Sequence, residues 1–339
     1  MERWSQAMPS RRAVLALGSA TALTAGLPHL AKAQARVADD PAMIAAAKQE
    51  GRVTVYANSD QAVTDRLLAF FTDKYGIAID LQRLAATALA QRFTVEYETN
   101  KHVADLYVTT DPLFAAQALA KGWMVKVDNL PAMAAWPPAA VQRGPAVLSM
   151  SPFVLAWNTT MAPGRLTSIE ALNDPRFKGR VVVNDPRALP ASRPWYLAVL
   201  QKYGEGFLKE LGSHAAMAPN AATAMQHLVS GLMVIYAPAV LPSVNEAIQS
   251  GATLNFAILD PVVVNKTVAA IPAKAPHPAA ARLLLNYWMS VEGQEVFSRR
   301  SYTLMPGVLG TSVLPSYVDV DAEAGERELG RINALLGIG

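Results

Sequence analysis

Short apolar runs alternate with longer stretches of helical periodicity over residues 41–123. Residues 51–57 (Gly-Arg-Val-Thr-Val-Tyr-Ala) are the first such run and predict a buried strand. In the next segment, apolar residues at 63, 67, 68, 70 and 71 predict an amphipathic helix that ends at Gly76. The expected elements are helix 41–49, strand 51–57, this helix, strand 77–81, helix 87–100, strand 104–108 and a helix from 112 to about 122.

A similar alternation follows a proline-rich stretch at 129–144 and a long extended run at 146–158. The expected elements there are strand 180–184, helix 195–203, helix 221–230 and strand 232–236. Strands separated by helices of about 10–15 residues are typical of βαβ units and a mainly parallel sheet. The pattern predicts an α/β protein of two lobes, each a mostly parallel sheet flanked by helices, with a hinge of extended crossings.

The predicted division places residues 36–150 and 263–295 in the first lobe, and residues 151–262 and 296–339 in the second. In open α/β sheets, ligands lie at the carboxyl ends of the strands. We therefore expect a binding cleft between the lobes at those ends. They fall at residues 58–61, 109–111, 185–193 and 236–238.

The first 35 residues have the organisation of an export signal. Residues 10–15 (Ser-Arg-Arg-Ala-Val-Leu) pair two arginines ahead of an apolar stretch, and residues 33–35 (Ala-Gln-Ala) give a small-residue end. The arginine pair predicts a partner in the twin-arginine export machinery, and hence a periplasmic protein. The alternative is a short amphipathic helix or membrane anchor, but about 15 apolar residues are too few for a hydrocarbon core roughly 30 Å thick.

Charge and cysteine content exclude several function classes. Residues 1–35 contain four basic residues and one acidic residue, a surplus equal to the +3 of the whole chain, so the remainder is neutral. A basic surface for nucleic acid therefore has no support from the overall charge. The absence of cysteine excludes disulfides, cysteine-bound zinc, iron–sulfur clusters and thiol nucleophiles.

Four segments together resemble the periplasmic solute-binding proteins of ABC importers, in the group that includes the ferric-iron-binding proteins. They are residues 50–56 (Glu-Gly-Arg-Val-Thr-Val-Tyr), 104–107 (Ala-Asp-Leu-Tyr), 172–181 (Leu-Asn-Asp-Pro-Arg-Phe-Lys-Gly-Arg-Val) and 279–295, which ends in Ser-Val-Glu-Gly-Gln-Glu. The resemblance covers nearly all of residues 41–310. It implies a type II binding fold that closes on a small ligand and delivers it to an inner-membrane permease.

The chain departs from the iron-binding members of that group at the metal site. Those proteins hold the metal with two adjacent tyrosines after a late strand, together with an acid or histidine from the early loops. Here the late strand has one tyrosine, Tyr236, followed by Ala237 and Pro238, and the early positions are Asp60 and Thr110. A ferric ion prefers several hard anionic oxygen ligands, so iron or an iron chelate is kept only as the alternative ligand and no metal site or cofactor is expected.

The strongest candidate for ligand contact is the segment 185–196. Ser192 is a good N-cap for the helix that follows, and a helix N-terminus attracts a carboxylate or phosphate. Arg187 and Arg193 would add planar, bidentate donors for the same anion. The alternative is that both arginines are solvated or pair with Asp174 and Asp185.

The other candidates come from the remaining strand ends and from the extended crossing. Asn58, Ser59, Asp60, Thr109 and Thr110 are polar residues that either contact ligand or cap the next helix. The further candidates are Ser151 in the crossing, Trp195 as an aromatic wall and Tyr236 at the end of its strand.

These observations predict a non-enzymatic, monomeric binding protein for a small organic anion, either a carboxylate or a phosphonate or phosphate ester. The competing hypothesis is a periplasmic enzyme exported in the folded state. The sequence has no Gly-x-Ser-x-Gly elbow, Gly-x-Gly-x-x-Gly loop, phosphate-binding lysine loop or His-Glu-x-x-His motif, so nothing in it favours catalysis.

Overall fold

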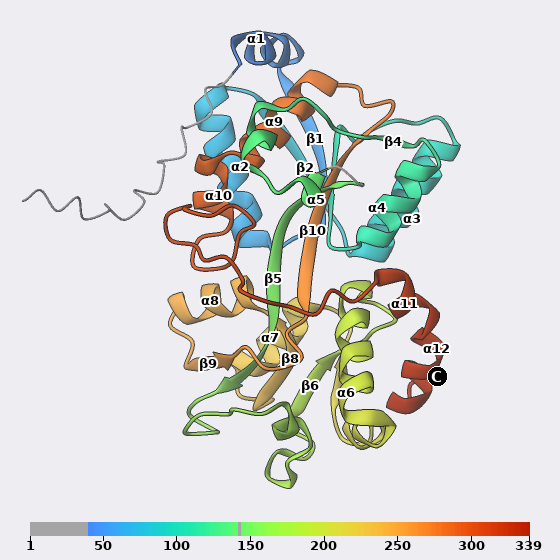
Figure 1. The fold of residues 1–339 in the computed structure, drawn as a ribbon, viewed down its shortest axis with the longest axis vertical. Coiled ribbons are helices and arrows are strands. Elements are labelled where there is room, and N and C mark those ends of the chain that lie inside the picture. The colour runs from blue at the N-terminus through green and yellow to red at the C-terminus, as the bar shows by residue number, and fades with distance from the viewer. Residues whose placement is uncertain (1–39, 142–143) are drawn as a thin grey trace, which may run out of the picture. The chain divides into compact units, whose positions relative to one another are not determined.

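The computed structural model describes residues 40–141 and 144–339 (Figure 1). The predicted export signal over residues 1–35 lies outside the described residues. Within them, no helix is long and apolar enough to cross a membrane.

The strands of the described chain form one mixed ten-stranded sheet in the order β2-β1-β3-β10-β5-β8-β6-β7, with β4 paired to β10 and β9 paired to β5. Their bounds are β1 (Arg52–Ala57), β2 (Ala78–Arg83), β3 (Leu106–Thr109), β4 (Met124–Val125), β5 (Ala146–Asn158), β6 (Val181–Asn184), β7 (Ala216–Ala218), β8 (Ile235–Val240), β9 (Leu254–Ala257) and β10 (Val264–Pro272).

The sheet divides into two parallel parts that are joined by antiparallel strands. In the first lobe, β1 lies parallel to both β2 and β3. In the second lobe, β6 lies parallel to both β7 and β8. The long strands β5 and β10 pair with each other in antiparallel fashion and run from one lobe into the other (Figure 1). The predicted two-lobed α/β fold with extended crossings is confirmed, whereas the predicted residue boundaries of the lobes stay predictions.

Helices cover the faces of both parts of the sheet (Figure 1). Those around the first lobe are α1 (Pro41–Glu50), α2 (Gln61–Tyr75), α3 (Ala86–Glu98), α4 (Pro112–Ala120), α5 (Pro138–Val141), α9 (Pro278–Met289) and α10 (Val291–Phe297), with the 3₁₀ helix η1 (Pro131–Ala135). Those around the second are α6 (Arg193–Gly212), α7 (Ala221–Val229), α8 (Leu241–Gln249), α11 (Ala322–Arg327) and α12 (Leu329–Leu336), with η2 (Ile169–Asn173), η3 (Pro175–Phe177) and η4 (Pro190–Ser192).

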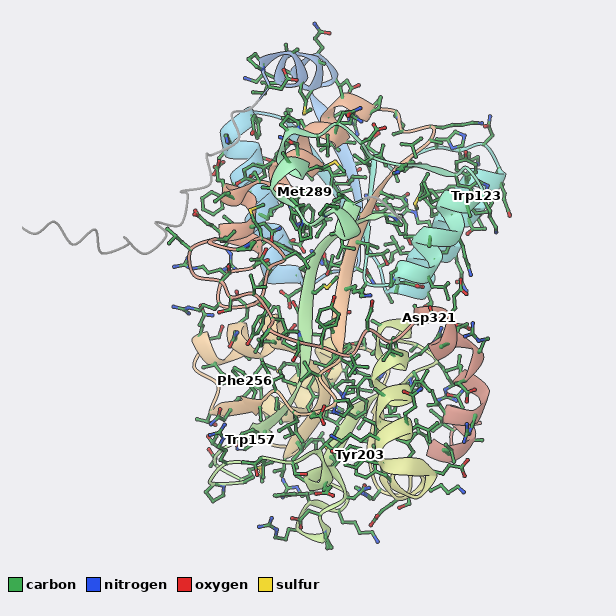
Figure 2. All side chains as sticks on the ribbon, in the orientation of Figure 1. Trp123, Trp157, Tyr203, Phe256, Met289 and Asp321 are labelled. Carbon is green, nitrogen blue, oxygen red and sulfur yellow. The ribbon has the colours of Figure 1, made fainter. Side chains whose placement is uncertain are left out.

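Each lobe has its own buried core, with large side chains distributed through it (Figure 2). In the first lobe, Phe71 of α2 and Trp288 of α9 are fully buried in one apolar cluster. In the second lobe, Trp157 of β5 and Tyr196 of α6 share a cluster with Ile332 of α12. The end of the chain is therefore part of the second core.

Two acidic residues, Glu50 in segment 50–56 and Asp105 in segment 104–107, stabilise the first lobe through hydrogen bonds. The carboxylate of Glu50 accepts hydrogen bonds from the backbone N–H groups of Ala279 and Ala280 at the start of α9. The fully buried Asp105 accepts from the backbone N–H of Thr54 and from both the backbone and the ring of His277. A buried acceptor without a hydrogen-bond donor lowers the stability of the folded state, and these two carboxylates have their donors. We therefore assign Glu50 and Asp105 a structural role.

Two predicted elements differ from the structure. The strand predicted at 232–236 is displaced, because β8 begins at Ile235 and continues through Pro238 to Val240. The helix predicted at 195–203 is part of the longer α6, which is interrupted at Gly204 (φ +80°). Because β8 continues past Tyr236, that residue lies within a strand and not at its end.

Candidate functional site

A small cavity of about 40 Å³, called here the inner cavity, lies between the lobes. Seven of its lining residues carry a hydroxyl group, although most of its exposed surface is apolar, and no lysine, arginine or histidine of the described chain lines it. Its polar residues are Ser59, Asp60, Thr110, Ser149, Ser151, Asn265, Thr267, Ser298 and Ser301. The structure therefore brings together four of the predicted residues, namely Ser59, Asp60, Thr110 and Ser151.

Polar contacts from both lobes close the inner cavity. Asp60 caps α2 by accepting from the backbone N–H of Val63, while its second carboxylate oxygen accepts from Ser243 of α8 at 2.5 Å. On the same pair of helices, Arg66 and Glu246 form an ion pair at 2.7 Å. A volume of about 40 Å³ is far below the several hundred Å³ of typical ligand sites, so an organic ligand needs the lobes to separate first.

The ends of β1 and β3 are held in register by two predicted residues. The side chain of Asn58 donates to the hydroxyl of Thr110 and accepts from the backbone N–H of Thr110. The buried hydroxyl of Thr109 accepts from the backbone N–H of Asp111. Asn58 and Thr109 line neither cavity; Asn58 positions Thr110 at the cleft, and Thr109 positions Asp111.

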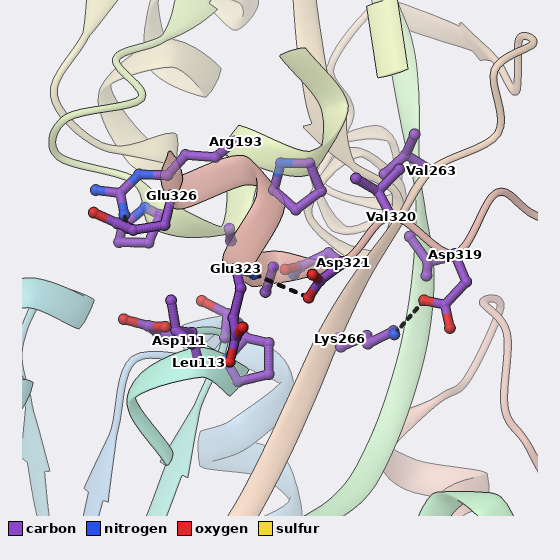
Figure 3. Close-up of a pocket in the computed structure, with 18 of the residues that line it drawn as sticks. Asp111, Leu113, Arg193, Val263, Lys266, Asp319, Val320, Asp321, Glu323 and Glu326 are labelled. Carbon is purple, nitrogen blue, oxygen red and sulfur yellow. Dashed lines mark hydrogen bonds and ion pairs between the residues drawn. The ribbon is translucent and has the colours of Figure 1, made fainter. Parts of the chain in front are cut away.

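A second cavity of about 390 Å³, called here the outer cavity, adjoins the first (Figure 3). Its walls come from the start of α4, the start of α6, strand β10 and residues 318–326 near the end of the chain. Its volume lies within the range of small-molecule sites. Thr110 and Asn265 line both cavities, so the two are neighbouring parts of one cleft.

The outer cavity carries charges of both signs (Figure 3). The cations are Arg193, paired with Glu326, and Lys266, paired with Asp319 at 2.5 Å. Further lining carboxylates come from Asp111, Asp321 and Glu323. Burial raises the pKa of the Asp111 carboxyl; the charge of Glu326 also raises it, while the backbone N–H groups of α4 and Arg193 oppose the shift.

Two residues of the inner cavity, Asn265 and Ser301, each have a buried polar atom with no hydrogen-bond partner among the described residues. In Asn265, which is 8% exposed, this atom is the Oδ1 oxygen; in Ser301, which is 5% exposed, it is the hydroxyl. A buried acceptor without a donor costs about 1–3 kcal/mol of folding free energy. A ligand hydroxyl or amine in the cleft would supply that donor.

Four other predicted residues line neither cavity. The exposed Arg187 pairs with Asp185 and donates to the carbonyl of Ile338, and this pairing holds the pKa of the Asp185 carboxyl below its usual range. Ser192 makes no cap bond to the helix that follows, because its hydroxyl donates to the carbonyl of Leu189 inside η4.

The two aromatic candidates belong to the core of the second lobe. Trp195 packs in the cluster beneath α6. Tyr236 is 1% exposed, and its hydroxyl donates to the side-chain oxygen of Asn184. Burial raises the pKa of the Tyr236 phenol, which disfavours the phenolate that a ferric ion would need.

Sequence reasoning missed the contribution of β10 and of the end of the chain. Asn265, Lys266 and Thr267 are a polar triplet within an otherwise apolar strand, and they face the two cavities. Such a polar interruption of an apolar run was the available signal. Residues 318–326 carried no comparable signal, because their place in the cleft depends on long-range packing.

The chain matches the family model described as bacterial extracellular solute-binding protein over residues 52–303. This match spans most of the described chain. The chain belongs to that family.

Several solved structures share the fold of this solute-binding protein. The substrate-binding protein of an ABC transporter from Agrobacterium tumefaciens aligns with a TM-score of 0.73 and 16% identity, over 84% of this chain and 94% of that one. AfuA from Actinobacillus pleuropneumoniae, with fructose-6-phosphate bound, gives 0.72 and 16%, over 85% and 99%. Iron-bound HitA from Pseudomonas aeruginosa gives 0.65 and 20%, also over 85% and 99%. At these identities the likeness shows the fold alone, so the ligand must be argued from the residues of the cleft.

Proposed function

We propose that this protein is the periplasmic substrate-binding component of an ABC importer, which captures a small organic anion in its cleft and delivers it to an inner-membrane permease. Membership of the solute-binding family supports the binding role. The fold shared with an ABC transporter's binding protein supports the importer. Because members of this family bind solutes, the family comparison gives no support to the alternative hypothesis of a periplasmic enzyme.

The observation that carries the choice of an anion is the placement of Arg193 and Lys266 in one cavity. A guanidinium binds a carboxylate or a phosphate oxygen pair with two parallel hydrogen bonds. The inner cavity beside it, where the Asn265 Oδ1 and the Ser301 hydroxyl have no partner among the described residues, suits the neutral, oxygen-bearing part of the same molecule. A ligand that carries an anionic group at one end and hydroxyl groups at the other would fit the two cavities. Such ligands include hydroxylated carboxylates and phosphonate or phosphate esters.

The acids in the outer cavity define how such an anion would bind. Both cations already have carboxylate partners, Glu326 and Asp319, so an incoming anion replaces those carboxylates and does not add to them. The side chains of Glu326 and Asp319 are 48% and 65% exposed, so water solvates them after the exchange. The cost of releasing these two carboxylates is therefore modest, whereas Asp111, Asp321 and Glu323 stay in the cavity and repel the anion.

The iron alternative finds less support in this cleft. Within residues 40–141 and 144–339, no group of three or more histidine, aspartate or glutamate side chains is arranged to hold a metal ion. Asp60 is committed to Val63 and Ser243, and Tyr236 is buried against Asn184.

A thermal-shift screen of the purified protein tests the ligand class. The screen should contain dicarboxylates, phosphonates, sugar phosphates, cationic amines and ferric citrate. A ligand at 100 times its Kd adds about 2.7 kcal/mol to the free energy of unfolding, which raises Tm measurably. We expect organic anions to give the shifts; shifts with ferric salts alone, or with amines alone, would contradict the proposal.

A matched pair of variants then tests the site. R193Q removes the guanidinium that lines the outer cavity, whereas R187Q removes one that is paired outside both cavities. We expect R193Q to weaken binding of the anion by on the order of 2 kcal/mol, about thirtyfold in Kd. R187Q should bind like the parent protein, and equal losses in the two variants would argue against the outer cavity.

The export route is part of the same proposal. The arginine pair Arg11–Arg12 supports transport by the twin-arginine machinery. Replacing both by lysine should leave the protein in the cytoplasm when cells are fractionated. Light scattering of the exported protein checks the predicted monomer.

A further inference from the structure

Residues 318–326, called here the acidic segment, begin beside the residues that precede β10 and lead along the outer cavity toward α12. The backbone N–H of Val318 donates to the carbonyl of Val262 at 2.8 Å, which fixes one end of the segment beside the hinge. Asp321 caps α11 by accepting from the backbone N–H of Glu323. At its other end the segment leads into α12, whose Ile332 is buried in the second core.

The acidic segment places two carboxylates on the two cations of the outer cavity (Figure 3). Glu326 contacts the Nη1 atom of Arg193, and Asp319 contacts the ammonium of Lys266 at 2.5 Å. Arg193 is 11% exposed and Lys266 26%, so both cations are largely withdrawn from water, whereas their acidic partners are not. In each pair the cation is thus the more buried member of the cavity wall and the carboxylate is the more exposed, replaceable partner.

Close packing fixes the first of these pairs. A Cβ atom added at Gly325 would lie 3.2 Å from the Cβ of Arg193 and 3.4 Å from its carbonyl carbon. Absence of a side chain at Gly325 thus lets α11 approach the start of α6 and brings Glu326 onto the guanidinium. The Arg193 Nε–H is held independently by the carbonyl of Pro186, so the guanidinium keeps its place if Glu326 leaves.

We infer that the two carboxylates of the acidic segment occupy the positions of the two anionic groups of a dianionic ligand and compete with that ligand for Arg193 and Lys266. This inference rests on the proposed function and narrows its ligand class. A ligand with two anionic groups replaces both carboxylates, whereas a monoanion leaves one of them in the cavity.

Competition within one chain raises the ligand concentration needed for binding. A tethered carboxylate has a high effective concentration at its cation, so a free anion must overcome it. Partly exposed ion pairs each contribute up to about 1 kcal/mol, which corresponds to about fivefold in Kd. The remaining carboxylates, Asp111, Asp321 and Glu323, repel any anion that enters the cavity.

Isothermal titration calorimetry of the double variant D319N/E326Q tests the inference. The probes are succinate and fructose 6-phosphate as dianions and succinamate as the matched monoanion. The control is E328Q, which removes a neighbouring carboxylate that pairs with Arg331 and does not line the outer cavity. Both replaced side chains are partly exposed, and the free energy of unfolding of each variant is measured by urea titration to confirm folding.

We expect the double variant to bind both dianions at least about fivefold more tightly than the parent protein and E328Q. Succinamate should gain less. Equal dianion affinities in the double variant and in E328Q would overturn the competition, while a loss in R193Q alone would leave the proposed function standing. Binding of neither dianion to any of these proteins would also overturn it, and the broader anion screen would then decide the proposed function separately.

Discussion

Ser243 of α8 donates a 2.5 Å hydrogen bond to the carboxylate of Asp60, across the boundary between the two lobes. Asp60 also caps α2, so one side chain ends the polar turn after β1 and contacts the other lobe. Together with the Arg66–Glu246 pair, this bond holds the lobes close around the inner cavity.

Removing this bond should favour the open arrangement of the lobes. A hydrogen bond to a charged group contributes about 1.5–3 kcal/mol, so S243A should shift the ligand-free protein toward an open form. Small-angle X-ray scattering should show a larger radius of gyration. The control S250A removes a hydroxyl at the exposed end of α8, and an equal change in both variants would contradict the assignment.

Replacing Asn265 should separate stability from binding. Its buried Oδ1 lacks a partner in the described structure, so N265L should leave the free energy of unfolding unchanged or raise it by about 1 kcal/mol. The same change removes an acceptor shared by both cavities, and the anion should bind at least about tenfold more weakly. Calorimetry and urea titration measure the two effects, and a variant that loses stability but keeps affinity would show that Asn265 serves the fold.

Because the pKa of Asp111 is raised in the folded state, ionisation of this carboxyl should lower the stability of the protein as pH rises. The folded state binds a proton on this carboxyl more tightly than the unfolded state, so folding is favoured at low pH and that contribution is lost as pH rises through the raised pKa. D111N removes the buried charge and retains a side-chain oxygen able to cap α4. At pH 7 the variant should therefore be more stable than the parent protein, and the difference should close as pH falls toward about 4, the ordinary range of aspartate.

Urea titrations of both proteins at several pH values test this expectation. D73N, which changes an exposed aspartate of α2, supplies the control. A stability difference between D111N and the parent that is the same at every pH would exclude titration of Asp111 as its cause.

Two glycines of α6 should respond to alanine in opposite ways. A Cβ atom at Gly212 would lie 2.4 Å from the carbonyl oxygen of Leu336, so G212A must push α12 away from α6. Overpacking of this kind costs about 1–3 kcal/mol. Gly206 has open space around it, so G206A should be neutral or stabilising by up to about 1 kcal/mol. Thermal unfolding compares them, and a smaller loss in G212A than in G206A would disprove this packing argument.

Local patterns predicted the alternating elements of the first lobe well. The apolar stripe of α2 lies in the core through Leu67 and Phe71, as its spacing requires, whereas Phe70, which was counted in the same stripe, is 50% exposed. The caps at Asp60 and Asp111 were also foreseeable, since each depends on residues only three positions away. The position of β8 was less accessible, because Pro238 argues against a continuing strand and only its pairing with β5 and β6 establishes it.

The cleft was predictable only in part. Asp185 was among the expected alternatives as a partner for Arg187, and it lies only two positions away along the chain. Arg193 instead pairs with Glu326, which is 133 positions away and reaches it only because α11 packs on α6. A contact between residues so far apart in the chain produces no periodic or local sequence pattern. The sequence therefore indicated Arg193 as a candidate but not Glu326 as its partner.

After α10 the chain makes a further passage between the lobes. Val308 is buried in the first core and Val320 packs against the second, so the intervening residues form a strap that crosses β5 and β10 on its way to α11 (Figure 1). Eleven residues, 309–319, lie between them, and the backbone N–H of Val318 ties the far part of the strap to Val262. Two fluorophores, one attached at each end of this strap, would change their separation whenever the lobes close. The strap is therefore a suitable place to label the protein as an optical sensor of its ligand.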